Sequence, residues 1–86
     1  MEVPSGTMPK PGLFARAISG EIRSVMARKQ VSGAQLATRV GRSPSYISKR
    51  LRGDASFSAN DVEDICRVLE EDLLTLLTAA VRSARR

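Results

Sequence analysis

The stretch SGAQLATRVGRSPSYISKRLRGD, residues 32–54, carries the start and stop signals of two short consecutive helices. Ser32 is a suitable N-cap for a helix from residue 33 to 39 or 40, because a serine hydroxyl accepts a hydrogen bond from a free N–H of the first turn. Gly41 predicts the end of this helix, because glycine readily takes the left-handed conformation that follows many helices. The segment therefore predicts one short helix and then a sharp turn.

A second helix is predicted directly after that turn. Ser43 supplies its N-cap, and Pro44 takes its first position, where no backbone N–H needs a partner. Ile47 and Leu51 lie four residues apart, so we expect them to anchor one face of the helix to a core. Gly53 marks its end. No acidic residue occurs from residue 34 to 53, so the outer face of this helix is basic.

Three further helices are predicted from apolar residues at helical spacing. The first runs from Leu13 to about residue 29 or 30, the fourth is capped by Ser58, and the fifth is capped by Asp72. Their predicted inner faces are Phe14, Ile18, Ile22, Val25 and Met26; Val62, Ile65, Cys66 and Leu69; and Leu73, Leu76, Leu77, Ala80, Val81 and Ala84. No alternating strand pattern occurs, so the predicted fold is all-α with five helices.

The chain of 86 residues suits one domain. Three prolines and two glycines in residues 1–12 predict a flexible N-terminal arm. We expect the folded domain at 13–84, with its two central helices at 33–52, and a basic tail at 85–86.

The composition argues against an enzyme or a metal site. The chain has no histidine, which is the commonest general base and metal ligand, and Cys66 is its only cysteine. We therefore expect no disulfide, no metal and no cofactor. No apolar run is long enough to span a bilayer, and the first residues lack the apolar core of a signal peptide, so we expect a cytoplasmic protein without a membrane partner.

Charge is distributed unevenly along the sequence. The net charge is +5, but residues 10–52 contain ten basic residues and a single acid, Glu21. Residues 53–81 contain seven acids and a single base, Arg67, and three arginines follow. A strongly basic side indicates a polyanionic partner, for which nucleic acid is the leading candidate, or a solvated surface.

The motif A-x-x-x-G at Ala37–Gly41, followed by S-x-S-Y-I-S-K-x-L-x-G at Ser43–Gly53, resembles the Cro/cI-like helix-turn-helix family, also called the XRE family. A looser resemblance extends from Phe14 to Leu77. It implies a five-helix, lambda-repressor-like domain of the kind found in bacterial and phage transcription regulators, with the helix at 44–52 inserted into the major groove. Arg50 stands where many members have an aliphatic residue, and Pro44 where several phage repressors have a base-reading side chain.

This resemblance predicts two sets of DNA contacts. Base edges are expected to meet the N-terminal part and outer face of the recognition helix, and phosphates to meet flanking cations and the free N–H groups of the preceding helix. The predicted base-reading residues are Ser43, Pro44, Ser45, Tyr46 and Lys49. The predicted phosphate ligands are Gly33, Ala34, Arg42, Arg50 and Arg52.

The last helix has a longer apolar stripe than a small core needs. We expect either packing against the first helix or a homodimer interface, and a dimer would bind a palindromic operator. The candidate interface residues are Leu74, Leu77, Ala80, Val81 and Ala84.

The sequence thus predicts a sequence-specific regulator that binds double-stranded DNA. A repressor is expected, because repression requires only that the protein occupy an operator. It would be a phage-immunity repressor, a Cro-like protein or a bacterial XRE-type regulator. The alternative is an antitoxin-type protein-interaction module that also binds DNA, whose acidic segment 61–72 would face a basic partner.

Overall fold

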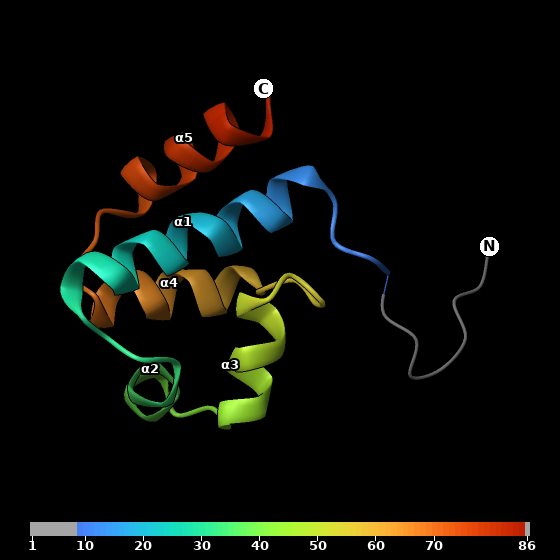
Figure 1. Cartoon of the computed structure of the whole chain (residues 1–86). Coiled ribbons are helices and arrows are strands. Elements are labelled where there is room, and N and C mark those ends of the chain that lie inside the picture. Colours follow the sequence, from blue (N-terminus) through green and yellow to red (C-terminus); the bar gives the residue numbers. More distant parts are fainter. Residues whose placement is uncertain (1–8, 86) are drawn as a thin grey trace.

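The computed structural model describes residues 9–85. Within this range the chain forms five helices and no strand, which confirms the predicted all-α architecture (Figure 1). Residues 1–8 of the predicted arm and Arg86 of the predicted tail lie outside the described residues, so those two predictions stay predictions. The helices are α1 (Leu13–Lys29), α2 (Gly33–Val40), α3 (Pro44–Leu51), α4 (Ala59–Val68) and α5 (Leu73–Ala84).

The helices around the central turn begin and end where the sequence predicts. The Ser32 hydroxyl accepts a hydrogen bond from the backbone N–H of Gln35 at 3.1 Å. The Ser43 hydroxyl accepts one from Tyr46 N–H at 3.2 Å, and Pro44 occupies the first position of α3. Gly41 ends α2 with a φ of 70°, a conformation that a side chain would strain.

Two caps also fix the later helices. Ser58 and Asp61 form a reciprocal capping box at the start of α4, and Asp72 accepts a hydrogen bond from Thr75 N–H at 2.9 Å at the start of α5. Both were predicted as caps from residue type and position.

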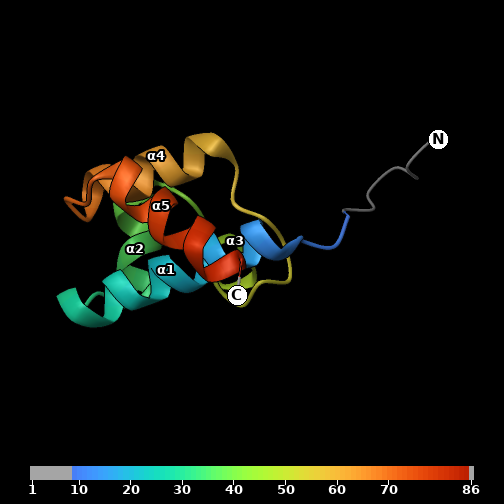
Figure 2. The same ribbon diagram turned by 90° about the horizontal axis from the view of Figure 1, so that it is seen from above.

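The core lies where the five helices meet, and α5 packs on α1 and crosses it at an angle (Figures 1 and 2). Ile47 and Leu51 are buried, as predicted, so they hold α3 to the domain. Phe14 was expected on the inner face of α1 but is 44% exposed, because it sits in the first turn of α1, where it lines an open apolar groove with Phe57 and Leu77. The core residues are Ile22, Val25, Met26, Leu36, Ala37, Ile47, Leu51, Val62, Ile65, Cys66, Leu69 and Leu76.

The structure corrects one residue of the predicted dimer interface. Ala80 is 0% exposed, because it faces the interior of the single chain, so its side chain is not available to a partner. Leu77 and Ala84 are only partly accessible, whereas Leu74 is 72% exposed and Val81 is also exposed. The exposed apolar part of α5 is therefore narrower than the stripe suggested.

Candidate nucleic-acid interface

The N-terminal ends of α2 and α3 open onto one shared groove. It has a volume of about 760 Å³ and is lined by residues from both helices and by Arg23 of α1. A Cβ added at Gly33 would lie 3.6 Å from Cδ1 of Leu51, so the start of α2 lies close against α3. The other residues on the groove are Ala34, Pro44, Ser48, Arg52 and Asp54. Backbone N–H groups at the start of α2 thus lie beside the exposed face of α3, an arrangement suited to binding anions.

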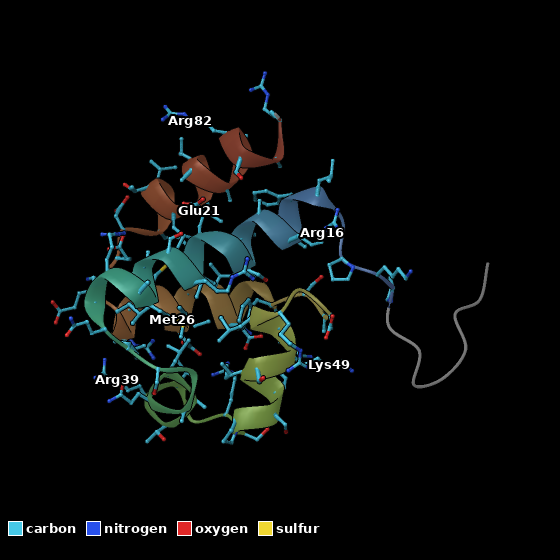
Figure 3. The ribbon with its side chains drawn as sticks, in the orientation of Figure 1. Arg16, Glu21, Met26, Arg39, Lys49 and Arg82 are labelled. Atoms are coloured by element: carbon cyan, nitrogen blue, oxygen red, sulfur yellow. The ribbon has the colours of Figure 1, made fainter. Side chains whose placement is uncertain are left out.

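The outer face of α3 is polar, exposed and turned away from the core. Pro44, Ser48 and Arg52 follow one another at intervals of four residues, and Ser45 and Lys49 lie beside them. The Lys49 side chain forms no hydrogen bond or ion pair with the described residues, and it projects from α3 into solvent (Figure 3). Its ammonium group is free to donate to guanine O6 and N7.

Arg52 is tethered but accessible. Its Nη1 donates to Oγ of Ser48 at 2.8 Å, and its Nε pairs with Oδ2 of Asp54 at 3.0 Å. The Arg52 side chain is nevertheless 61% exposed. An exposed pair of this kind contributes little to stability, so a phosphate can replace Asp54 as the partner of Arg52.

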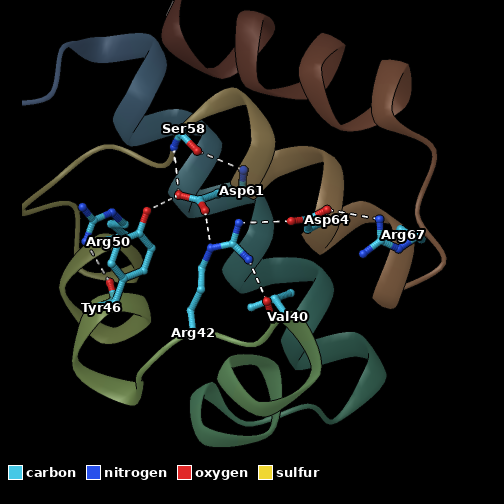
Figure 4. Close-up of polar contacts among 8 residues, drawn as sticks. All are labelled: Val40, Arg42, Tyr46, Arg50, Ser58, Asp61, Asp64 and Arg67. Atoms are coloured by element: carbon cyan, nitrogen blue, oxygen red, sulfur yellow. Dashed lines mark hydrogen bonds and ion pairs between the residues drawn. The ribbon is translucent and has the colours of Figure 1, made fainter.

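Two predicted DNA contacts instead face inward, toward α4 (Figure 4). The Tyr46 hydroxyl donates to Oδ2 of Asp61 at 2.7 Å, and Nε of Arg42 pairs with Oδ1 of the same carboxylate at 2.6 Å. Nη2 of Arg42 also reaches Oδ2 of Asp64 at 3.0 Å. The side chain of Asp61 is only 1% exposed. Tyr46 and Arg42 therefore have a structural role, because the Tyr46 hydroxyl and the Arg42 guanidinium are bound to acids of α4.

The pKa values of this cluster follow from its hydrogen bonds. Burial alone would raise the pKa of Asp61, but hydrogen bonds from Tyr46 and Ser58 and the charge of Arg42 together lower it. The hydrogen bond to Asp61 raises the pKa of Tyr46, and that to Asp64 raises the pKa of Arg42. Asp61 is thus a buried anion held in its charged form by its neighbours.

Arg50 also turns inward rather than toward a phosphate. Its guanidinium lies 3.5 Å from the centre of the Tyr46 ring, and its Nη1 donates to the Tyr46 carbonyl at 3.2 Å. The carbonyl of Arg50 accepts a hydrogen bond from the buried Ser19 of α1 at 2.8 Å. Stacking on Tyr46 explains how an arginine takes a position where the resembling family has aliphatic residues, because the flat cation covers the ring as an apolar side chain would.

Ser48 and Arg23 are site residues that the sequence analysis missed. Ser48 lies on the exposed face of α3 and was given no role, although its spacing from Pro44 and Arg52 was a usable signal. Arg23 of α1 donates a hydrogen bond to the carbonyl of Leu51 and so caps the C-terminal end of α3. The Arg23 side chain also lines the groove. No local pattern links residues 23 and 51, so this contact was not predictable.

Two other features are absent among residues 9–85. No group of three or more histidine, cysteine, aspartate or glutamate side chains is placed to hold a metal ion there. None of the helices there has both the length and the apolar character needed to span a membrane.

The fold and this groove define a helix-turn-helix protein, and comparison of the sequence with known families agrees. The family described as "Helix-turn-helix domain" matches residues 17–78, which is well over half of the chain. The chain belongs to this family and is a DNA-binding transcription regulator rather than an enzyme. The resemblance stated from the motifs is therefore confirmed.

Among solved structures, the chain is similar to the clp gene regulator ClgR from Corynebacterium glutamicum, with a TM-score of 0.79 and 30% identity over 90% of this chain and 81% of that one. The restriction-modification controller protein C.Esp1396I has a TM-score of 0.76 and 18% identity, covering 85% of this chain and 95% of the other. A hypothetical transcription factor from Neisseria, NHTF, has a TM-score of 0.67 and 21% identity, covering 88% and 84%. The last two support the fold alone. No curated protein matches the sequence.

Proposed function

We propose that this regulator binds a specific double-stranded DNA site with α3 in the major groove, and that it represses transcription by occupying an operator. The observation that carries this proposal is the exposed outer face of α3, where the Lys49 side chain has no partner among the described residues and the Ser45 hydroxyl has only a 3.4 Å contact with the Ser43 hydroxyl. Ser48 and Arg52 lie on the same face. Serine and lysine side chains match the donors and acceptors that base pairs present in the major groove.

The free N–H groups at the start of α2 and the Arg52 guanidinium supply the phosphate contacts in this proposal. They lie on the groove that α2 and α3 share, beside the exposed face of α3. Phosphate contacts fix the register of the protein on the duplex, and base contacts give the sequence preference. Pro44 and Ser43 lie at the leading end of α3, where Pro44 can touch a thymine methyl group.

We also propose a homodimer on a palindromic operator, with Leu74 and Val81 of α5 at its centre. These two side chains lie seven residues apart on one exposed helical face. A dimer would place two copies of α3 about one helical turn of DNA apart. Sedimentation of the wild-type chain and of Leu74→Lys checks this part; a monomeric wild-type chain on a non-palindromic site would contradict it.

Selection of bound duplexes from a random pool, followed by sequencing, provides the operator. Affinity of the wild-type chain and of Lys49→Ala is then measured on the selected site and on a scrambled duplex of equal length. Loss of a good base contact lowers discrimination by about 1–3 kcal/mol, so we expect Lys49→Ala to lose affinity mainly for the selected site.

Arg67→Ala is the matched control, because it also removes one positive charge. Arg67 lies on α4, is exposed, and pairs only with Asp64 among the described residues. We expect its loss to affect both duplexes slightly and equally. If Lys49→Ala behaves as Arg67→Ala does, Lys49 reads no base; if the wild-type chain selects no duplex, the function proposed here is wrong.

A further inference from the structure

α3 is connected to α4 through long side chains rather than through close packing of their backbones. Within the described chain, no Cα of α3 lies within 8 Å of a Cα of α4, whereas α3 packs closely on α1 and α2. The space between α3 and α4 is crossed by the Tyr46 side chain, which ends at the Asp61 carboxylate. The orientation of α3 relative to α4 is therefore set by the polar contacts at Asp61 together with the core packing of Ile47 and Leu51.

The carboxylate of Asp61 has a partner for each oxygen. Oδ2 accepts from the Tyr46 hydroxyl at 2.7 Å and from Ser58 N–H at 3.0 Å, and Oδ1 pairs with Arg42 at 2.6 Å. Arg42 belongs to the turn between α2 and α3, and its Nη1 also holds the Val40 carbonyl at 2.7 Å. One buried anion thus joins the recognition helix, the turn before it and the start of α4.

From this geometry we infer that Asp61 is a positioning residue for DNA recognition, which holds α3 at the tilt that its base contacts require. The inference rests on the proposed function. A helix with a fixed tilt is already in the binding-competent orientation, and a helix that tilts freely spends only part of its time there. Contacts to phosphates tolerate such motion better than contacts to base edges do, because base contacts need defined hydrogen-bond geometry.

Charge and position can be separated with isosteric variants. Tyr46→Phe removes the hydroxyl that reaches Asp61, keeps the ring beneath Arg50 and changes no charge. Asp61→Asn keeps the shape but removes the anion. Asp64→Asn is the matched control, because it removes an equal charge from the Arg42 cluster and leaves the Tyr46–Asp61 hydrogen bond intact.

The full chain and each variant are titrated with the selected duplex and with its scrambled counterpart. Circular dichroism checks that each variant is folded at the temperature of the titration. We expect Tyr46→Phe and Asp61→Asn to lose about tenfold in affinity for the selected site, which corresponds to one hydrogen bond to a charged group. Scrambled DNA should be bound equally well by Tyr46→Phe and equally or more tightly by Asp61→Asn, because that variant has one negative charge fewer.

A purely electrostatic role gives a different result. Asp61→Asn and Asp64→Asn would then strengthen binding to both duplexes alike, and Tyr46→Phe would bind as the wild type does. A purely structural role would lower the melting temperature but leave the affinity of the folded variants within about twofold of the wild type. Either result overturns the inference about Asp61 alone, whereas a wild-type chain that prefers no duplex overturns the proposed function as well.

Discussion

The two polar sides of α3 have similar residue types but opposite surroundings. On the outer side, Ser45 and Lys49 are exposed; the Lys49 ammonium has no partner among the described residues, and the Ser45 hydroxyl has only a 3.4 Å contact with the Ser43 hydroxyl. On the inner side, Tyr46 and Arg50 stack on each other, and the tyrosine hydroxyl is bound to Asp61. The cations of the basic stretch therefore fall into two groups. The Lys49 side chain is available to a polyanion, whereas Arg42 pairs with the acids Asp61 and Asp64 of α4.

The largest expected effect on stability comes from removing the core contact that both sides of α3 depend on. Ile47 is fully buried between the helices. Ile47→Ala leaves a cavity and should destabilise the fold by about 2–5 kcal/mol, measured by urea unfolding. Both sides of α3 would then lose their position together.

Lys49→Ala is the control for that measurement, because it lies on the same helix with its side chain in solvent. Its unfolding free energy should stay within about 0.5 kcal/mol of the wild type. An Ile47→Ala protein as stable as Lys49→Ala would show that α3 is not anchored through this residue.

The next prediction tests the inner side of α3 through the dependence of protein stability on pH. Because the pKa of Asp61 is lowered in the folded chain, its contribution to stability is complete above the ordinary value of 3.8 and is lost as the pH falls through the lower folded value. Asp61→Asn should lose about 1–3 kcal/mol at neutral pH, as expected when a buried hydrogen-bonded group is replaced. Its stability should then fall less steeply than that of the wild type below pH 3.8.

Asp72→Asn serves as the comparison for the acid measurement. Hydrogen bonds from the backbone N–H and hydroxyl of Thr75 also lower the pKa of Asp72, but this residue caps α5, far along the chain from α3. In Asp72→Asn, the loss of stability that comes from protonating Asp61 should remain as in the wild type. Parallel stability curves for Asp61→Asn and the wild type would mean that Asp61 is not held as an anion in the fold.

The helices and their ends could be predicted from sequence because their causes are local. Ser32, Ser43 and Ser58 each cap a helix whose first free N–H groups lie within three residues of them. Gly41 ends α2 for an equally local reason, since its φ is positive. The anchoring of α3 by residues four apart followed from helical periodicity alone.

The assignment of individual cations could not be predicted, because their partners are distant in sequence. Arg42 meets Asp64 across 22 residues, and Tyr46 meets Asp61 across 15 residues. Most basic residues precede residue 53 and most acids follow it, but charge counting does not show which of them pair in space. Ala80 illustrates the same limit for apolar residues, because a stripe on a helix does not reveal which neighbours already cover it.

Arg52 is expected to have a small effect on stability, and it compares the two sides of α3 through the salt dependence of DNA binding. Its pair with Asp54 is exposed, so Arg52→Ala should change the unfolding free energy by less than about 1 kcal/mol. If Arg52 holds a phosphate, removing it lowers the slope of log affinity against log salt concentration by about 0.9, because one fewer counterion is released per complex. Arg50→Met also removes one positive charge, but its guanidinium is engaged by Tyr46, so the slope should stay as in the wild type. Equal slopes for both variants would place the two arginines in one class, and the division of α3 into a DNA-facing side and a fold-facing side would then be wrong.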